Sequence, residues 1–227
     1  MRGIFVTGTG TDIGKTYVST LICKHLVNLN YDIAYYKAAI SGALSTEESD
    51  AGCVKKFAGL KQKSESLLSY LYKDPLSPHL AARIENNFVN LDKIKEDFTK
   101  VALAHDLVLV EGSGGIVCPI VYEKECKILL EDIIKSLGLN VIVVADAGLG
   151  TINQVTLTCN YLKSRNFKIN GIIFNNFEDG NLMHQDNLKM VEALNDVKVI
   201  ATVSRGGNDL KLRLASLVSV FDEIYHS

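Results

Sequence analysis

Residues 3–16 read Gly-Ile-Phe-Val-Thr-Gly-Thr-Gly-Thr-Asp-Ile-Gly-Lys-Thr, and this stretch decides the fold. Ile4–Val6 form an unbroken apolar run, which is typical of a strand buried on both faces. Helical periodicity begins at Lys15-Thr16, after three glycines at Gly8, Gly10 and Gly14. A strand, a glycine-rich loop and a helix that opens on Lys-Thr form the pattern of a P-loop, whose backbone N–H groups and lysine bind nucleotide phosphates.

The last two residues of the loop have expected roles. Lys15 is expected to reach the outer phosphates, and Thr16 to place its hydroxyl on a magnesium ion. The loop is one residue longer than usual, because the common spacing puts the first glycine at Thr9 and here it is Gly8. The alternative is a glycine-rich turn that precedes Lys-Thr by chance. The strand before the loop and the helix after it favour a nucleoside triphosphate site.

Composition excludes several classes of protein. The chain has 227 residues, and because 47% of them are apolar it can bury a core. Its net charge is -2, so we expect no basic face for nucleic acid or a membrane surface. Its five cysteines are an odd number without C-x-x-C spacing, which favours free thiols in a reducing compartment. No signal peptide precedes the first strand and no apolar run is long enough for a membrane span. We therefore expect a soluble, cytoplasmic protein.

Apolar runs alternate with segments of helical spacing along the chain. After the first strand, strands are expected at 32–36, 106–111, 140–145, 168–175 and 197–203. Helices are expected at 17–29, 50–57, 77–83, 91–104, 127–137, 151–164, 181–195 and 208–225, with a loop over 38–49 and a less regular stretch over 59–80. This alternation predicts βαβ units and one doubly wound α/β domain over 1–227, a mostly parallel sheet flanked by helices with the P-loop NTPase fold.

Polar residues and glycine turns follow the expected strands at one edge of the predicted sheet. The P-loop follows the first strand, Lys37 the second and Glu111 the third. The turn Gly148–Asn153 follows the fourth, and Asn175-Asn176 ends the fifth. Ligands of open α/β sheets bind beyond the carboxyl ends of the strands. These residues are therefore expected to form one site.

Three of these side chains have alternative interpretations. Glu111 is either a solvated strand end or a magnesium carboxylate, and the turn Gly112–Gly115 that follows favours the second. Asp50 fits a further oxygen ligand of the metal and an acid at a helix N-terminus equally well. Lys37 is either a surface lysine or a clamp on phosphate charge, and its place beside the phosphate loop favours the clamp.

At these residues the chain resembles the dethiobiotin synthetase family, the ATP-dependent carboxylases of biotin synthesis. The resemblance covers residues 1 to about 176 in order, and the elongated P-loop is the family's own spacing. The other matching motifs are Tyr35-Tyr-Lys37, Ser41-Gly42, Ser49-Asp50-Ala51, Ser77-Pro-His79, Val110–Gly115 with Pro119, and Leu149–Asn153.

The resemblance implies a ligase that closes a cyclic urea on 7,8-diaminononanoate with CO2 while ATP is hydrolysed to ADP and phosphate. One substrate amine captures CO2 as a carbamate, and the carbamate oxygen attacks the γ-phosphate. The second amine then displaces phosphate from the mixed anhydride. Because no protein nucleophile is needed, positioning and charge stabilisation carry the chemistry.

The resemblance also implies roles for the matched residues. Catalysis would involve Lys15, Lys37 and Thr11, and Mg2+ would be held by Thr16, Asp50 and Glu111. ATP would be bound by Gly10, Thr11, Asp12, Ile13, Gly14, Lys15, Thr16, Tyr17 and Asn175, of which Asn175 reads adenine. The diamine end of the substrate would contact Thr11, Lys37, Ser41 and Gly114.

The family is homodimeric, and the resemblance implies a substrate site shared between two subunits. The substrate carboxylate would be bound by the turn of the other subunit, through Gly150, Thr151, Ile152 and Asn153. A helix N-terminus suits a carboxylate because its backbone N–H groups carry partial positive charge.

Three segments depart from the family pattern. Ala38-Ala39 stand where a proline usually follows the lysine, and they are expected to loosen the loop that carries Ser41. Gln154 stands where histidine is common. Ala201–Gly207 replaces a Gly-x-Ile-Pro pattern that helps to enclose the base, so the sequence leaves the nucleotide preference open.

The alternative function is a dimerising switch ATPase of the partitioning or septum-placing type, which shares the P-loop. Those proteins carry a signature lysine early in the loop, where this chain has Thr9, Gly10 and Thr11. They also tend to have a basic DNA surface or an amphipathic membrane tail, and the segment Phe221–Ser227 is not basic. The synthetase is therefore favoured.

Overall fold

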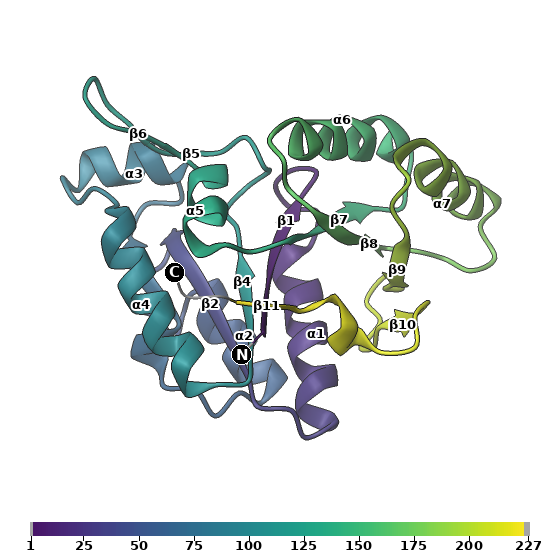
Figure 1. Ribbon diagram of the computed structural model, residues 1–227, viewed down its shortest axis with the longest axis horizontal. Coiled ribbons are helices and arrows are strands. Elements are labelled where there is room, and N and C mark those ends of the chain that lie inside the picture. The colour runs from purple at the N-terminus through teal and green to yellow at the C-terminus, as the bar shows by residue number, and fades with distance from the viewer. Residues whose placement is uncertain (1, 225–227) are drawn as a thin grey trace.

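The computed structural model describes residues 2–224, and nine of its strands form one continuous sheet (Figure 1). These strands are β1 (Arg2–Gly8), β2 (Ile33–Ser41), β3 (Leu68–Tyr72), β4 (Leu107–Glu111), β7 (Val141–Asp146), β8 (Ile169–Asn175), β9 (Val199–Thr202), β10 (Lys211–Leu212) and β11 (Asp222–Glu223). Their order is β10-β9-β8-β7-β1-β4-β2-β3, and β11 pairs with β1. All neighbours from β9 to β3 are parallel, whereas β10 and β11 are antiparallel to their partners.

The first strand lies in the middle of the sheet because its residues are apolar on both faces. Ile4 and Val6 contact the core on one face and Phe5 the core on the other, and all three are buried. Phe5 is opposite Val110 of β4 and Val141 of β7. The loop that follows β1 is therefore held at the centre of the carboxyl edge.

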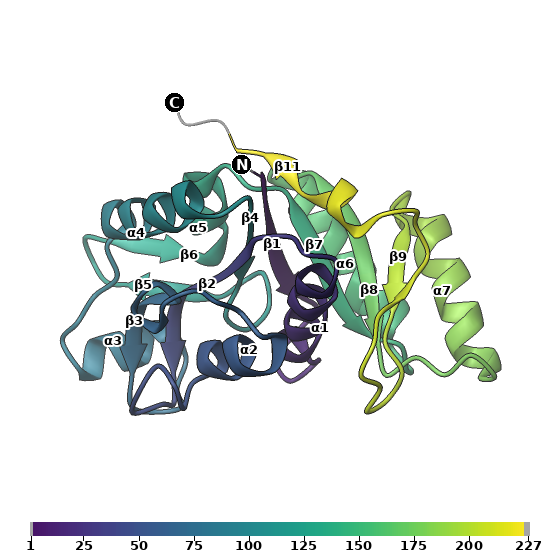
Figure 2. The ribbon, with the colours of Figure 1, turned by 90° about the horizontal axis from the view of Figure 1, so that it is seen from below.

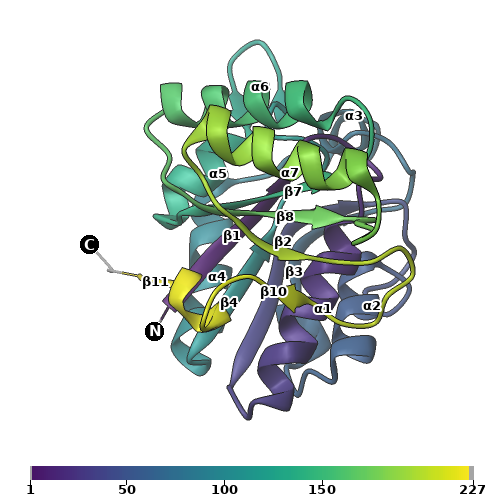
Figure 3. The same cartoon turned by 90° about the vertical axis from the view of Figure 1, so that its right-hand side faces the viewer.

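Helices cover both faces of the sheet. On one face lie α1 (Lys15–Asn28) and α2 (Asp50–Ala58); the other carries α3 (Pro78–Ile84), α4 (Leu91–Ala104), α5 (Leu130–Leu137), α6 (Thr151–Ser164) and α7 (Leu182–Asn195). Figures 2 and 3 show this arrangement from below and from one side. The predicted α/β class with a mostly parallel sheet is confirmed, and the assignment of 1–227 to one domain stays a prediction. Within residues 2–224, every helix is too short or too polar to span a bilayer.

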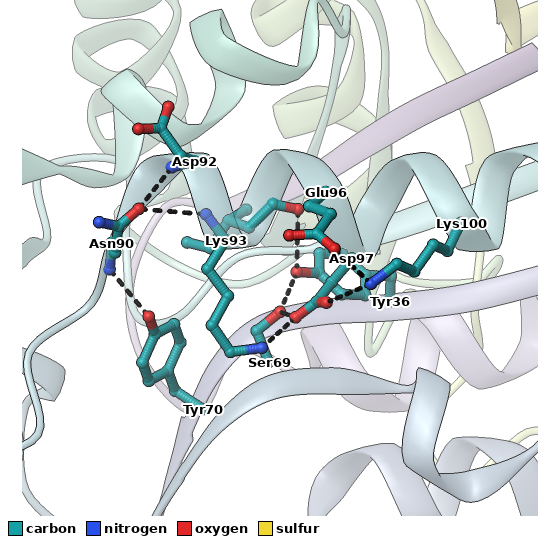
Figure 4. Close-up of polar contacts among 10 residues, drawn as sticks. Tyr36, Ser69, Tyr70, Asn90, Asp92, Lys93, Glu96, Asp97 and Lys100 are labelled. Carbon is teal, nitrogen blue, oxygen red and sulfur yellow. Dashed lines mark hydrogen bonds and ion pairs between the residues drawn. The ribbon is translucent and has the colours of Figure 1, made fainter.

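A polar network fixes α4 against β2 and β3 (Figure 4). The Tyr36 and Ser69 hydroxyls lie 2.6 Å apart, and Ser69 also donates to Asp97 at 2.6 Å. Asp97 is further bound by Lys93, one turn earlier on the same helix. Because Tyr36 and Ser69 come from neighbouring strands, this network sets the position of α4 over that side of the sheet.

The middle of the chain contains more strand than predicted. β2 continues to Ser41, where a loop was expected from residue 38, and β3 lies inside the stretch expected to be irregular. A separate two-stranded sheet of β5 (Pro119–Tyr122) and β6 (Lys127–Leu129) was not predicted either, and α5 begins after it, at Leu130. β3 is a partly buried strand at the end of the sheet and contains Ser69, so it lacks the unbroken apolar run by which the central strands were recognised.

The helix predicted over 208–225 is wrong for residues 208–224, and residue 225 lies outside the described residues. The segment is extended at β10, forms a short 3-10 turn at Leu217–Val220 and is extended again at β11. Its first apolar residues, Leu210, Leu212 and Leu214, recur every second position and pack against the core, which is the spacing of a strand. The 3-10 turn then fills the same core beside α1.

Candidate active site

β1 delivers the glycine-rich loop to the carboxyl edge of the sheet, where α1 begins. Gly14, the residue before the helix, has φ 87°, and a Cβ there would lie 2.2 Å from the Asn175 side chain. Only glycine fits this left-handed and crowded position. α1 has neither a side-chain cap nor an acidic residue in its first turn, so its first backbone N–H groups are available for phosphate oxygens.

Lys15 is held over the loop. Its ammonium donates to the Gly10 carbonyl at 2.8 Å, and the residue is 8% exposed. Burial lowers the pKa of Lys15, although the nearby charge of Glu111 acts in the opposite direction. A buried ammonium folded back on its own loop can exchange this one carbonyl for a phosphate group.

The ammonium of Lys37 lies between two carboxylates. Its Nζ is 2.6 Å from Asp50 Oδ2 and 2.9 Å from Glu111 Oε1. Glu111 Oε1 also accepts a hydrogen bond of 2.8 Å from the Thr16 hydroxyl. Burial alone would lower the Lys37 pKa, but the charges of Glu111 and Asp50 and their hydrogen bonds raise it. Four residues predicted as clamp and metal ligands are therefore brought together.

Asp50 is the acid at a helix N-terminus that the sequence allowed, and its carboxylate also points into the site. It is the first residue of α2, whose N-terminus is capped by the Ser49 hydroxyl, and its carboxylate reaches Lys37. Burial alone would raise its pKa, but the charge and hydrogen bond of Lys37 hold that pKa below its ordinary value. The Asp50 side chain is 51% exposed, whereas that of Glu111 is fully buried. Asp50 thus lies on the solvent side of the cluster and Glu111 on the core side.

Two neighbouring cavities share the residues at their junction. The first has a volume of about 370 Å³ and is lined by Thr11, Asp12, Gly14, Lys15, Thr16, Lys37, Asp50, Glu111 and Gly114. The second, of about 700 Å³, is lined by Ile40, Ser41, Pro75–Pro78, Ser113–Gly115 and Val117–Pro119, together with Thr11, Asp12, Lys37 and Asp50. The phosphate loop therefore opens directly into a space that also contains the predicted substrate residues Ser41 and Gly114.

The oxygen atoms around the first cavity fit a magnesium ion. Thr16, Asp50 and Glu111 supply a hydroxyl and two carboxylates, and Glu111 Oε2 is buried without a hydrogen-bond partner. Mg2+ is commonly held by one or two carboxylates and completes its shell with water and phosphate. In residues 2–224 no three His, Cys, Asp or Glu side chains gather into an all-protein metal cage.

Asn175 and Tyr17 lie beside the phosphate loop rather than in either cavity. The Asn175 amide donates to the Ile13 carbonyl at 3.0 Å, and the side chain is packed against Gly14. The Tyr17 hydroxyl donates to the Gly207 carbonyl and so joins α1 to the segment 201–207 that departs from the family pattern. The segment 201–207 therefore contacts the helix that begins at the phosphate loop.

The turn Gly150–Asn153 does not line these cavities. It lies at the start of α6, with Gly150 at φ 91° before the helix and no side-chain cap. Within one chain, then, the structure does not bring this turn to Lys37 and Ser41. The uncapped start of α6 lies at the same edge of the sheet as the two cavities.

The structure also shows contacts of residues to which no role was assigned from the sequence. The Ser113 hydroxyl donates to the Ala39 carbonyl at 2.8 Å and ties the turn after β4 to the end of β2. Ala39, Ile40 and Ser41 pair with β3, so the expectation of a loosened loop around Ser41 is wrong. The Ser77-Pro-His79 motif signalled a site segment, and Pro75–Pro78 indeed form a wall of the larger cavity.

Another cavity, of about 690 Å³, lies near the opposite ends of β8 and β9. Lys168 and Arg213 line it, but they already face Asp222 and Glu192. The carboxyl ends of the strands, with the phosphate loop and the carboxylate cluster, remain the better candidate for the chemistry.

Comparisons with known proteins find similar sequences that cover nearly the whole chain. A family model described as an AAA domain matches residues 2–206. The chain is 49% identical to an ATP-dependent dethiobiotin synthetase BioD of Brachyspira hyodysenteriae, over 97% of this chain and 99% of that protein. It is 44% identical to a protein of the same name from Clostridium botulinum strain Loch Maree, over 98% and 99% of the two chains.

Solved structures show the fold alone. The MinC:MinD cell division protein complex of Aquifex aeolicus matches with a TM-score of 0.55 at 12% identity, covering 97% of this chain and 85% of that chain. Chloroplast FtsY of Physcomitrella patens matches with a TM-score of 0.53 at 15% identity, covering 96% and 64%. These neighbours share the P-loop architecture, and the low identities carry no argument about activity.

Proposed function

The chain belongs to the ATP-dependent dethiobiotin synthetase family, and from this premise we propose how its own residues divide the work. Its function is the ATP-dependent synthesis of dethiobiotin, in biotin biosynthesis. The switch ATPase alternative is not favoured, because the MinD likeness is at 12% identity and the synthetase likeness at 49%. Our assignment of roles to residues rests on one observation. The two cavities meet at Thr11, Lys37 and Asp50.

The phosphate loop binds and orients ATP. The first backbone N–H groups of α1 and the Lys15 ammonium bind the outer phosphates, and Asn175 beside Gly14 contacts the base. This places the γ-phosphate at the side of the smaller cavity that opens toward the substrate. The larger cavity then takes the diamine end of the substrate, against Thr11, Ser41 and Gly114.

Thr16, Asp50 and Glu111 are proposed to hold Mg2+, which supplies charge neutralisation on the transferring phosphoryl group when it is bound. Lys37 is then no longer needed as the counter-charge of two carboxylates. Its ammonium, between the two cavities, is free to stabilise the carbamate and the phosphoryl oxygens.

The reaction then needs only positioned reactants. One amine of 7,8-diaminononanoate adds to CO2, loses a proton and becomes a carbamate. A carbamate oxygen forms a bond to the γ-phosphorus as the bond to ADP breaks. The second amine forms a bond to the carbonyl carbon, phosphate leaves, and the ring is closed. Lys15 and Lys37 stabilise negative charge in the second and third steps without a covalent intermediate on the protein.

We further propose that the active assembly is a homodimer. The turn Gly150–Asn153 has an uncapped helix start at the carboxyl edge and lies outside the cavities of its own chain. In a dimer it can bind the substrate carboxylate in the cavity of the partner, as the family resemblance implies.

The test of the reaction is phosphate release from ATP and Mg2+, with and without the diamine and bicarbonate, together with mass detection of the cyclic urea. We expect release to require both substrates and the product mass to appear with it. Slow release that is indifferent to the diamine contradicts the synthetase function.

The test of the assignment is Lys37→Ala, which is expected to lower kcat by at least about 100-fold because a transition-state charge loses its partner. The matched control is Lys100→Ala, whose exposed lysine pairs with Glu96 on α4, away from both cavities. Lys100→Ala is expected to retain full activity. Equal effects of the two substitutions contradict the role of Lys37.

A further inference from the structure

Two polar atoms below the carboxylate cluster are buried and have no hydrogen-bond partner: the Tyr35 hydroxyl and Glu111 Oε2. Tyr35 is fully buried, and so is the Glu111 side chain. The two groups are nevertheless close enough to interact. Burial raises the pKa of the Tyr35 phenol, and the nearby charge of Glu111 raises that pKa further. The Tyr35 hydroxyl can donate a hydrogen bond and Glu111 Oε2 can accept one, so each atom can satisfy the other.

The strand geometry explains why Tyr35 is at this place. Tyr35 of β2 pairs with Leu109 of β4, two residues before Glu111 on the same strand, and both Tyr35 and Leu109 face the core below α1. β3 begins only at Leu68, opposite Lys37, so it offers no ladder partner to Tyr35. Instead the backbone N–H of Tyr35 donates to the buried side chain of Gln62 at 2.8 Å. The phenol is therefore fixed through its backbone as well as its ring.

We propose that Tyr35 is a positioning residue for Glu111, whose phenol donates to Oε2 and holds the carboxylate with Oε1 toward Thr16 and Lys37. This proposal rests on the proposed magnesium site. A carboxylate oxygen buried without a donor is costly, and Tyr35 is the donor that its own surroundings supply. Hydrogen bonds behind a metal-binding carboxylate orient it and set the affinity for the ion.

The consequence is a specific loss when the phenol is removed. In Tyr35→Phe the ring stays in the core, but Glu111 Oε2 loses its donor and the carboxylate is free to turn. We expect the affinity for a nucleotide with Mg2+ to fall about tenfold, as is usual for groups behind a metal ligand. Binding without Mg2+ is expected to be unchanged, because the phosphate loop contacts do not involve Tyr35.

The experiment is calorimetric titration of a non-hydrolysable ATP analogue, in Mg2+ and in EDTA, with the ratio of the two affinities as the readout. The matched control is Tyr36→Phe, which removes an equally buried phenol from the next residue of β2. The Tyr36 hydroxyl bonds to Ser69 on the opposite face of the sheet (Figure 4). The ratio is expected to fall in Tyr35→Phe and to equal that of the wild type in Tyr36→Phe.

A third variant, Glu111→Gln, separates this proposal from the one on which it rests. If Glu111→Gln loses most of the Mg2+-dependent gain and Tyr35→Phe loses none, the magnesium site stands and the role of Tyr35 is overturned. Equal losses in Tyr35→Phe and Tyr36→Phe overturn it as well, because the effect is then one of strand packing. If Glu111→Gln keeps the full gain, the proposed magnesium site itself is wrong.

Discussion

At the scale of single residues, Lys37 pairs with two carboxylates in the structure and is proposed to use the same charge in the reaction. Without a nucleotide it neutralises Asp50 and Glu111, at 2.6 and 2.9 Å. In the proposed reaction it faces the carbamate and phosphate instead. The charges of the buried cluster are therefore balanced both without a nucleotide and in the proposed reaction, and the cost of an isolated charge in the core is avoided.

This balance predicts the stability of Lys37→Met. The substitution leaves the fully buried Glu111 carboxylate without its counter-charge, and we expect a loss of about 3–5 kcal/mol in the free energy of unfolding. The double variant Lys37→Met/Glu111→Gln removes the stranded charge and is expected to recover most of that loss. Denaturant unfolding of both variants without nucleotide is the measurement, and a double variant as unstable as the single one contradicts the explanation.

The sequence identified most of this site because its residues follow the ends of strands. Lys37 and Glu111 could be recognised at the end of an apolar run, and Asp50 through a family motif. Tyr35 could not, because a tyrosine inside such a run carries no sign of what its hydroxyl faces. That depends on the register of β2 against β4, which pairs Tyr35 with Leu109.

At the scale of elements, α4 is joined to the sheet through one half-buried acid, Asp97. Asp97 accepts from Ser69 and Lys93 and lies close to Lys100, between the helix and the sheet (Figure 4). Burial alone would raise the pKa of Asp97, but the hydrogen bonds of Lys93 and Ser69 hold it below its ordinary value. A depressed carboxyl pKa stabilises the fold above the unfolded pKa and loses that contribution as the pH falls.

We therefore expect Asp97→Asn to lower the free energy of unfolding by about 1–2 kcal/mol at pH 7, through weaker hydrogen bonds to a charged group. The difference from the wild type is expected to shrink below about pH 4 and to vanish when Asp97 is protonated in both states. Unfolding titrations at several pH values measure this. The matched control is Glu96→Gln, one residue earlier on α4, whose exposed pair with Lys100 is expected to contribute under about 1 kcal/mol.

Elements were predicted well where length and periodicity agree. α4 was predicted over its observed residues 91–104, because one face is apolar over the whole helix. The segment 208–224 was not, because its apolar residues were interpreted as one face of an amphipathic helix, whereas Leu210, Leu212 and Leu214 alternate as in a strand. Tertiary structure decides between the helical and the strand period, because β10 pairs with the outer edge of β9.

At the scale of the whole molecule, the proposed shared site predicts that two inactive variants restore activity when they are mixed. A site contained in one chain cannot give this result. Asn153→Asp adds a negative charge at the start of α6, where the helix tolerates it but a substrate carboxylate is repelled. Lys37→Ala impairs the chemistry in the other half of the proposed shared site. Each variant alone is expected to have little activity.

Refolding the two variants together in equal amounts is expected to restore about a quarter of wild-type activity, because half of the dimers are mixed and each has one intact site. Phosphate release at subsaturating diamine is the measurement. If the whole site lies within one chain, the mixture has only the mean activity of the two variants, and the shared site is wrong.

The central position of β1 also has a consequence during synthesis of the chain. β1 is made before all of its neighbours in the sheet, of which β4 begins at Leu107, β7 at Val141 and β11 at Asp222. At about 5–20 residues per second, a ribosome needs roughly 5–20 seconds to proceed from β1 to β4. During that interval the apolar Ile4–Val6 run of the nascent chain has no sheet to join. Chains stalled before Glu111 are therefore expected to recruit chaperones and to bind no nucleotide.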